Sequence, residues 1–310
     1  MACPPAPPWR WIHYPMRCAD RVAPRGVGYA RRMTAFTLAD LRRVVEEFWP
    51  ANTAAEWDRV GLVTGRDAAP LRRVLLAVDA VRATVAEALE LRADALLTHH
   101  PLLLRGVHTV AEDTAKGALL GALIRGECAL LAAHTNADAP TDGVSDVLAQ
   151  RFGVRDARPI EVGADPTAGI GRVGTLAAPL PLGDFARVVA AALPPTVSGA
   201  RVAGDPHRLI SRVALCGGAG DSLLAHPAVR GADVYITSDL RHHPAQDAIE
   251  LAAVAGGPAL IDISHWAAES LWLEVAASRL EAALPGVAVT VSRVRSDPWQ
   301  FAVGAMPEAQ

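Results

Sequence analysis

The 310-residue sequence has few cysteines, a single lysine and no long hydrophobic run. Its four cysteines lie far apart and form no Cys-x-x-Cys pair, which argues against a disulfide scaffold or a zinc ribbon and favours a reducing, cytoplasmic location. No stretch of about 18 residues is both apolar and uncharged, so we expect no membrane-spanning helix. Lys116 is the only lysine among the 30 basic residues, which indicates coding bias rather than a function.

The charge balance argues against a protein that coats nucleic acid. The chain has a formal net charge of −3 and a pI near 6.4, without the basic stripe that such proteins carry. Residues 1–32 contain six prolines and six arginines but one acid, Asp20, and show no helical or alternating pattern. We therefore expect a disordered tail or a mis-assigned start, with Met33 as the natural first residue. The remaining 278 residues hold 24 basic and 32 acidic residues and sum to −8.

From residue 33 onward, short apolar strands alternate with amphipathic helices. The first helix is expected to begin at Thr37, where Asp40 completes an approximate capping box, and to stop at Pro50. Continuous apolar strands separated by helices are typical of parallel strands covered on both faces, so the pattern predicts an α/β fold with mainly parallel sheets. Strands are expected at 74–78, 95–98, 129–133, 173–176, 213–216, 234–237, 259–263 and 287–294, and further helices at 82–92, 114–124, 144–152, 185–193, around Leu223, 245–255 and 267–284.

A polar break with proline and glycine at residues 153–171 predicts a boundary between two α/β domains. The first domain is expected to cover residues 33–153 and to be joined by the C-terminal segment 265–310. The second domain is expected to cover residues 172–264. We find no internal repeat at the periods typical of solenoid proteins.

Histidines and carboxylates follow the ends of three expected strands. His99 and His100 come directly after the strand 95–98, Asp138 lies in the run that follows the strand 129–133, and His265 comes at the end of the strand 259–263. Open α/β sheets bind ligands at the carboxyl ends of their strands. Glu269 lies four residues after His265, and this spacing places both side chains on one helical face.

Each of these elements alone indicates little. A lone histidine after a strand is more often a structural hydrogen bonder, and Asp138 alone would be an ordinary turn residue. Three such elements at three strand ends are much less expected by chance. Three histidines with two carboxylates are too many for one tetrahedral structural zinc and suit two metal ions about 3.5–4 Å apart. The expected metal ligands are His99, His100, Asp138, His265 and Glu269.

The chain resembles the NIF3-like family of dinuclear-metal proteins, whose members are also described as GTP cyclohydrolase 1 type 2 homologues. The resemblance runs through nearly all of residues 33–300, and the motifs that carry it are Trp57-Asp58-Arg59-Val60-Gly61-Leu62, Thr98-His99-His100-Pro101, His134-Thr135-Asn136-Ala137-Asp138, residues 233–237 with Asp239, His243, and His265-Trp266-Ala267-Ala268-Glu269. It implies the same five metal ligands, a dinuclear metal site at the junction of the two domains and a hexameric ring of subunits. The long insertion that some bacterial members carry between their halves is absent, because residues 153–264 are too few to contain it.

Three further features have alternative interpretations. His243 is either an acid–base group or substrate contact that faces the site, or a structural residue. His134 is expected to orient the aspartate that follows it or to support the ligands from outside their shell. Gly217, Gly218 and Gly220 follow the strand 213–216 and precede a helix, where backbone N–H groups would cradle a phosphate, although a tight structural turn is the favoured interpretation.

Two functions fit this pattern. The first is a metal-dependent hydrolase in which two divalent ions (zinc, iron, manganese or nickel) activate a bridging hydroxide that attacks a phosphoester or, as in GTP cyclohydrolases, a ring carbon, with Glu269 and His243 in catalytic roles. The alternative is a non-catalytic metal carrier or regulatory scaffold that forms a ring. Five ligands for two ions leave open coordination positions, which favours the enzyme. The expected partners are copies of the chain itself and a small substrate, a nucleotide or another phosphoester; neither a membrane nor nucleic acid is expected.

Overall fold

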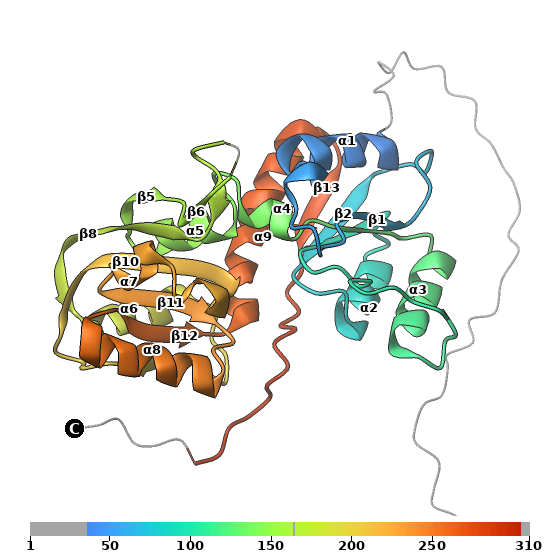
Figure 1. Cartoon of the computed structure of the whole chain (residues 1–310). Helices are drawn as coiled ribbons and strands as arrows, with labels where there is room; N and C mark the ends of the chain where they lie inside the picture. The colour runs from blue at the N-terminus through green and yellow to red at the C-terminus, as the bar shows by residue number, and fades with distance from the viewer. Residues whose placement is uncertain (1–35, 164, 305–310) are drawn as a thin grey trace, which may run out of the picture. The chain divides into compact units, whose positions relative to one another are not determined.

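Two mixed β-sheets flanked by helices make up the part of the chain that the structure describes (Figure 1). This computed structural model describes residues 36–163 and 165–304, and the predicted N-terminal tail lies outside them. The first helix, α1 (Leu38–Phe48), begins where the capping pattern predicts. The carboxylate of Asp40 accepts hydrogen bonds from the backbone N–H and the hydroxyl of Thr37, at 2.9 and 2.8 Å.

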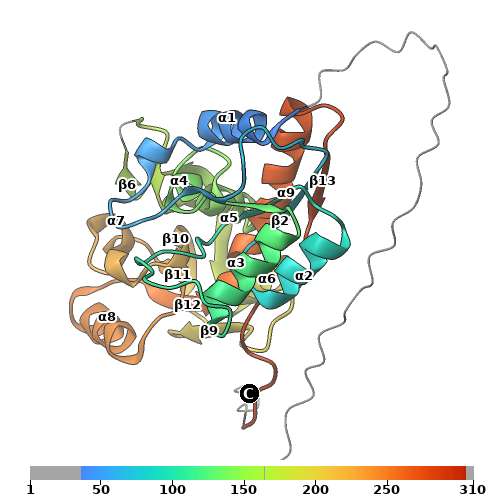
Figure 2. The ribbon, with the colours of Figure 1, turned by 90° about the vertical axis from the view of Figure 1, so that its right-hand side faces the viewer.

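One sheet has five strands, which are β1 (Gly61–Thr64), β2 (Arg73–Ala77), β3 (Ala95–Thr98), β4 (Ala129–Ala132) and β13 (Ala288–Val291). In the order β1-β4-β3-β2-β13, the last four run parallel, as predicted, and β1 pairs antiparallel with β4. Two helices, α2 (Arg82–Glu90) and α3 (Ala115–Arg125), lie side by side over one face of this sheet (Figure 2). Leu75 of β2 faces these helices and Leu76 faces the opposite side, which is why the predicted strand is apolar throughout.

The other sheet has six strands, which are β5 (Arg155–Arg158), β8 (Arg172–Pro181), β9 (Ala200–Ala203), β10 (Leu209–Ala219), β11 (Val234–Ser238) and β12 (Ala259–Ile263). Their order is β5-β8-β10-β11-β12-β9. Strands β10, β11 and β12 are parallel, but β5, β8 and β9 pair antiparallel with their neighbours. The prediction of a mainly parallel sheet is therefore wrong for this half of the chain. Edge strands β5 and β9 are short and largely exposed, so they lack the continuous apolar run on which the prediction relied.

One hydrophobic cluster joins the two sheets. Helices α1, α5 (Val144–Arg151), α6 (Leu182–Ala192) and α9 (His265–Ala283) contribute buried side chains to it, together with strands of both sheets. Helix α9 packs against β2 and β13 of one sheet and against β10 and β11 of the other. Its Trp272 is fully buried and meets Trp49 edge-on, with ring centroids 5.1 Å apart. The helix that carries two predicted metal ligands is thus held by both halves of the core.

The outer face of the six-stranded sheet is covered by α7 (Pro227–Arg230) and α8 (His242–Ala255), which pack around the buried Tyr235. The remaining elements are short, namely η1 (Ala51–Thr53), α4 (Thr135–Asp138), β6 (Glu161–Val162), β7 (Gly169–Ile170) and η2 (Asp221–Leu223). The predicted break at 153–171 contains β5 and the β6/β7 pair, and the boundary between two domains stays a prediction. Within the described ranges, no helix combines the length and apolar character that crossing a membrane requires.

Candidate metal centre

The predicted ligands come from elements of both halves of the chain. His99 and His100 directly follow β3, and Asp138 is the last residue of the short helix α4, which follows β4. His265 is the first residue of α9, because Ser264 caps this helix by accepting a hydrogen bond from the N–H of the third residue, at 3.2 Å. The prediction that His265 still belongs to the strand end, with the helix starting at residue 267, is therefore wrong.

Glu269 lies at the centre of the cluster. Its Oε1 is 2.8 Å from Nε2 of His265 and 3.4 Å from Nε2 of His99. Its Oε2 is 3.0 Å from Nε2 of His100, and that nitrogen is 3.2 Å from Nε2 of His265. Asp138 joins the group through Oδ1, which lies 3.6 Å from Nε2 of His99. The structure therefore brings all five predicted ligands together, with their donor atoms facing one common volume.

The three histidines are held through the ring nitrogen that faces away from this volume. The acceptors are Ala133 O for Nδ1 of His99 at 2.9 Å, Asp79 Oδ1 for Nδ1 of His100 at 2.7 Å, and Asp239 Oδ2 for Nδ1 of His265 at 2.7 Å. A carbonyl or an ionised carboxylate only accepts, so each Nδ1 carries a proton. Each Nε2 is thereby the nitrogen that can bind a metal ion, and the ring orientation is fixed from behind.

Three donor atoms of the cluster are buried without a hydrogen-bond partner, and this indicates whether metal ions fit the site. His99 Nε2, Asp138 Oδ1 and Glu269 Oε2 are buried and make no hydrogen bond. A buried polar atom without a hydrogen bond costs about 1–3 kcal/mol, and the ion pair with His100 offsets part of this cost for Glu269 Oε2. A bound cation would pair with all three at once. Two groups of side chains have ligand atoms within 4.8 Å of one another, namely His99, His100 and His134, and His100, His265 and Glu269. The residues present therefore fit divalent metal ions.

The two histidines beside the Glu269 carboxylate have raised pKa values. Burial disfavours a charged imidazole at His100, but the charge of Glu269 and the hydrogen bond to Asp79 outweigh it and raise the pKa of His100 to about 10. Burial is likewise outweighed by Glu269 and Asp239 at His265, whose pKa rises to about 11. Protons thus occupy, in the metal-free protein, the nitrogens that a metal ion would take.

The two carboxylates of the cluster differ in charge state. Burial opposes ionisation of Glu269, but the neighbouring histidines outweigh it and hold the pKa of Glu269 well below 4.5. Burial raises the pKa of Asp138 to about 6, and the charge of Glu269 adds to the rise while His99 opposes it. An ionised carboxylate therefore stays at the centre of the site across the neutral pH range.

His134 stands beside the cluster, with Asp58 behind it. Its Nδ1 lies 2.9 Å from Oδ1 of Asp58, whose Oδ2 accepts hydrogen bonds from the N–H and hydroxyl of Thr135 at 3.0 and 2.6 Å. The ring meets those of His99 and His100 edge-on, with centroids 5.2 and 5.3 Å away. Burial and the electrostatic effect of the neighbouring His99 lower the pKa of His134, which favours the neutral form that binds metal. His134 therefore offers the cluster a further donor in addition to its predicted supporting role.

Gly217 and Gly218 lie within strand β10, and Gly220 directly follows it. Strand β10 continues to Ala219 and the 3₁₀ turn η2 follows, so the predicted strand end at Cys216 is wrong. Gly218 has a φ of +70°, and a Cβ there would lie 3.0 Å from Oε1 of Glu269. Cβ atoms at the others would overlap side chains, Val144 Cγ1 at 2.5 Å for Gly217 and the Tyr235 hydroxyl at 2.3 Å for Gly220. These glycines allow close packing around the cluster, and their contact with a phosphate stays a prediction.

His243 makes no contact with the cluster among those that the structure gives for it. It lies exposed in the first turn of α8, where its ring meets that of His242 with centroids 5.1 Å apart. Its acid–base role stays a prediction.

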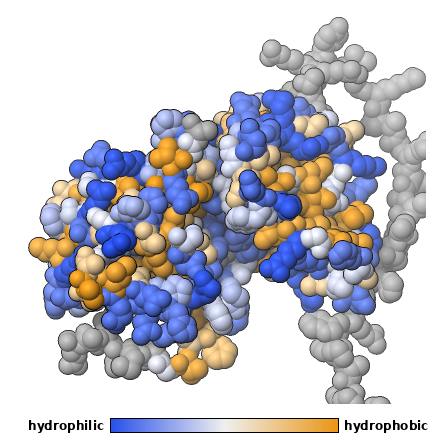
Figure 3. Space-filling model, in the orientation of Figure 1, coloured by the Kyte–Doolittle hydropathy of each residue, from blue (hydrophilic) through white to orange (hydrophobic). Residues whose placement is uncertain are grey.

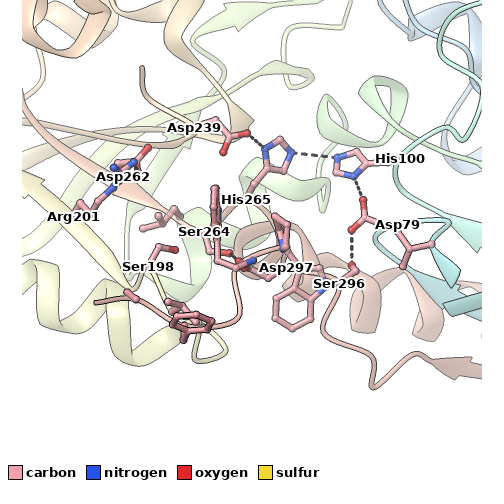
Figure 4. Close-up of a pocket in the computed structure, with 18 residues that line it drawn as sticks. Asp79, His100, Ser198, Arg201, Asp239, Asp262, Ser264, His265, Ser296 and Asp297 are labelled. Atoms are coloured by element: carbon pink, nitrogen blue, oxygen red, sulfur yellow. Dashed lines mark hydrogen bonds and ion pairs between the residues drawn. The ribbon is translucent and has the colours of Figure 1, made fainter. Parts of the chain in front are cut away.

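Several supporting residues were not predicted to have a role in the site. Asp79 follows β2 at the same carboxyl edge of the sheet as the histidines, so its position after a strand could have indicated a role in the site. Asp239 follows β11 and adopts a left-handed backbone with a φ of 57°. The hydroxyl of Ser296 donates a hydrogen bond to Oδ2 of Asp79 at 2.5 Å. The two residues are 217 positions apart in the sequence, and no local pattern links residues at that separation. Figure 4 shows the resulting row of side chains, which runs through Asp239, His265, His100, Asp79 and Ser296.

The fold and the cluster define an α/β protein with two mixed sheets and a group of histidines and carboxylates suited to metal ions. The model of the Duf34/NIF3 family (NGG1p interacting factor 3) matches residues 36–298. The chain therefore belongs to this family, which confirms the resemblance seen in the sequence motifs.

Relatives of known sequence agree with this assignment. A Streptomyces coelicolor protein named GTP cyclohydrolase 1 type 2 homolog is 43% identical over 278 residues, covering 87% of this chain and 96% of that protein. A Mycobacterium tuberculosis protein of the same name is 34% identical over 375 residues, covering 85% of this chain and 97% of that protein. That alignment is longer than the present chain, so the mycobacterial relative carries inserted residues that are absent here.

Solved structures show the same fold. A hypothetical protein of Staphylococcus aureus matches with a TM-score of 0.78 at 25% identity, over 86% of this chain and 100% of that chain. A Bacillus cereus protein related to NIF3 matches with a TM-score of 0.75 at 23% identity, over 84% of this chain and 97% of that chain.

Proposed function

We propose that this protein is a metal-dependent hydrolase that binds two divalent metal ions. The observation that supports this most is the gathering of five donor side chains, with three unpartnered buried atoms, beside a cavity of about 620 Å³ whose lining includes His100 and His265. The ligands of a structural metal site usually enclose the ion, whereas a site that borders a cavity leaves room for a substrate. The proposed substrate class is a phosphoester, including nucleotides, or a ring opened by hydrolysis, as the name of the relatives suggests.

The residues that would hold the ions are His99, His100, Asp138, His265 and Glu269. When bound, the ions would supply Lewis-acid activation of water and would stabilise negative charge that develops on the substrate. The chain itself keeps the donors aligned, because the Nδ1 hydrogen bonds fix each imidazole from behind. Glu269 stays ionised between the histidines, and its burial with His99 excludes bulk water, which strengthens the electrostatic interactions inside the site.

The substitution Glu269→Gln tests the proposal. It keeps the size of the side chain and removes the charge at the centre of the cluster. Protein purified anaerobically, analysed for its metal content and reloaded with zinc, iron, manganese or nickel in turn, is screened against nucleotides, phosphomonoesters and phosphodiesters. We expect turnover of at least one substrate, abolished by Glu269→Gln and kept by Glu274→Gln, an exposed position on the same helix. Reversible metal exchange without turnover of any substrate would instead support a non-catalytic metal carrier or scaffold.

The proposed acid–base role of His243 has a matched control in its neighbour. His242 and His243 are both exposed at the start of α8, but only His243 belongs to a family motif. We expect His243→Gln to lower kcat by about 100-fold and to change the pH profile, while His242→Gln leaves both unchanged. Equal effects of the two substitutions would remove His243 from the mechanism.

The proposal includes assembly into a hexameric ring, which rests on family membership. Light scattering of the full chain should then give six times the subunit mass of 32.6 kDa. A monomer mass at working concentration would contradict the ring.

A further inference from the structure

A cavity of about 620 Å³ opens beside the cluster of predicted metal ligands (Figure 4). His100 and His265 form one edge of the cavity. Another part of its lining comes from the segment after β13, with Pro298, Trp299 and Phe301. This volume lies within the range of about 300–1,000 Å³ that small-molecule sites occupy. The cavity is therefore large enough for a substrate whose reacting group reaches the histidine edge.

The segment that closes the cavity is tied to the supports of two predicted metal ligands. Ser296 donates to Oδ2 of Asp79, the residue that holds His100, at 2.5 Å. The next residue, Asp297, is buried and accepts a hydrogen bond from the hydroxyl of Ser264 at 2.6 Å. Ser264 in turn caps the helix that His265 begins. Two consecutive residues therefore fix this wall to both sides of the histidine edge.

Aromatic rings on this wall are exposed at the cavity. Trp299 is 65% exposed and Phe301 is 79% exposed, although both line the cavity. Figure 3 shows apolar residues gathered at the end of the described chain, where Figure 1 places this segment. Its anchor is local, because the N–H of Trp299 donates to Oδ1 of Asp297 at 2.9 Å. Exposed aromatic faces on an anchored segment at a cavity are suited to stacking on a flat ring.

The charges of the lining disfavour a polyphosphate. Of the lining residues that the structure describes, Arg201 is the only lysine or arginine, and its Nε and Nη2 are already paired with Asp262. The lining also contains the carboxylates of Asp79, Asp239 and Asp297. His100 and His265 are the other basic groups of the lining, and both are already paired with carboxylates of the protein. A triphosphate held away from this histidine edge would meet repulsion from the carboxylates. Both oxygens of Asp79 and of Asp297 already accept hydrogen bonds within the protein. Asp239 and the Ser198 hydroxyl could instead accept hydrogen bonds from ring N–H groups.

We propose that this cavity is the recognition site for a planar, uncharged heteroaromatic group, such as the base of a nucleoside, and that Trp299 and Phe301 stack on it. The inference rests on the proposed function in that the reacting group of the same substrate would lie at the His100 and His265 edge. It goes beyond the proposed function because it states that the substrate carries a planar, uncharged heteroaromatic group. Both aromatic residues lie beyond residue 298, where the match to the family model ends.

Binding by the full chain tests the proposal without relying on turnover. The purified protein, with metal and after EDTA treatment, is titrated calorimetrically with adenosine, guanosine, cytidine and uridine, and separately with inorganic tripolyphosphate. We expect at least one nucleoside to bind in both states. Trp299→Ala and Phe301→Ala should each weaken this binding about tenfold, the usual effect of losing one stacking partner. Val303→Ala is the matched control, because Val303 is 89% exposed on the same segment and lies outside the cavity lining.

Three results would overturn the proposal. These are no binding of any nucleoside, nucleoside binding that neither aromatic substitution weakens, and tripolyphosphate binding to the EDTA-treated protein as tight as that of a nucleoside. Because both side chains are largely exposed, their removal should leave the unfolding temperature unchanged, which is checked in parallel. The hydrolase proposal is judged separately by Glu269→Gln. Turnover without nucleoside binding would refute only the recognition site, and nucleoside binding without turnover would refute only the hydrolase.

Discussion

Gly218 leaves the space that the carboxylate of Glu269 occupies. A Cβ atom on Gly218 would lie 3.0 Å from Oε1 of Glu269 and 3.5 Å from Nε2 of His265. The backbone of Gly218 is also left-handed, with a φ of +70°, which side chains rarely adopt. Strand β10 therefore passes close behind two predicted metal ligands that belong to helix α9.

We expect Gly218→Ala to weaken metal binding by about tenfold, because the added methyl group displaces Glu269 or His265 from its position. The matched control is Gly153→Ala, where φ is +72° and nothing lies within 4 Å of the new Cβ. Both variants should lose about 1 kcal/mol of stability through backbone strain. Metal affinity measured by competition with a chelator distinguishes them, and an equal loss of affinity in the two variants would contradict this explanation.

The hydrogen bond between Asp239 and His265 provides a second prediction. Asp239→Asn keeps the size of the side chain and tolerates the left-handed backbone at this position, but it removes the charge that holds the imidazole. Loss of such a supporting carboxylate typically weakens metal affinity by about 10–100-fold. Asp247→Asn, an exposed position on α8, serves as the control. Unchanged metal affinity in Asp239→Asn would show that this carboxylate does not support a ligand.

The stability of the metal-free protein should fall as the pH rises above neutrality. The pKa values of His100 and His265 are raised from 6.5 to about 10 and 11, so the folded state binds these protons more tightly than the unfolded state. The contribution of these two histidines to the free energy of unfolding is complete below pH 6.5 and is lost as the pH rises through about 10–11. The raised pKa of Asp138, about 6, acts only at lower pH.

Thermal unfolding of EDTA-treated protein between pH 7 and about 9.5 checks this expectation. The unfolding temperature should decrease over this range, and added metal should restore it, because metal replaces the Nε2 protons and binds more tightly at higher pH. The double variant His100→Gln with His265→Gln should show a flatter pH dependence. A metal-free protein whose unfolding temperature rises with pH would contradict the assigned direction.

Arg172 is expected to be essential for stability. Its side chain is 1% exposed, and Nε lies 2.9 Å from Asp146 Oδ1. Its remaining nitrogens donate to four backbone carbonyls, those of Ala139, Pro140, Gly169 and Gly171. Arg172→Met removes the partner of Asp146 Oδ1 and a donor to the carbonyls of Gly169 and Gly171, whereas the carbonyls of Ala139 and Pro140 keep backbone N–H donors. Because a buried ion pair is broken, we expect a loss of about 3–5 kcal/mol in denaturant unfolding. Arg187→Met, which breaks an exposed pair with Asp184, should cost less than about 1 kcal/mol. Similar losses in the two variants would contradict this account.

The sequence predicted the central strands well and the outer strands poorly. Strands β2, β3, β4, β11 and β12 are apolar runs buried on both faces, and this local property is visible in the sequence. Strands β5 and β9 are mostly exposed, so their pairing depends on neighbours that are distant in the chain. Glycines are typical of turns, but Gly217 and Gly218 lie inside strand β10, where the close packing of neighbouring atoms leaves no room for a side chain.

The sequence by itself determined which groups can bind metal, because positions just after strands and the spacing of His265 and Glu269 are local features. Only the tertiary structure decided how these groups are supported and what lies beside them. Ser296 reaches Asp79 across 217 positions, and the residues that line the cavity come from six separate segments of the chain. Such contacts result from the packing of helix α9 against both sheets and from the hydrogen bonds of Ser296 and Asp297 to Asp79 and Ser264, and no short sequence pattern encodes them.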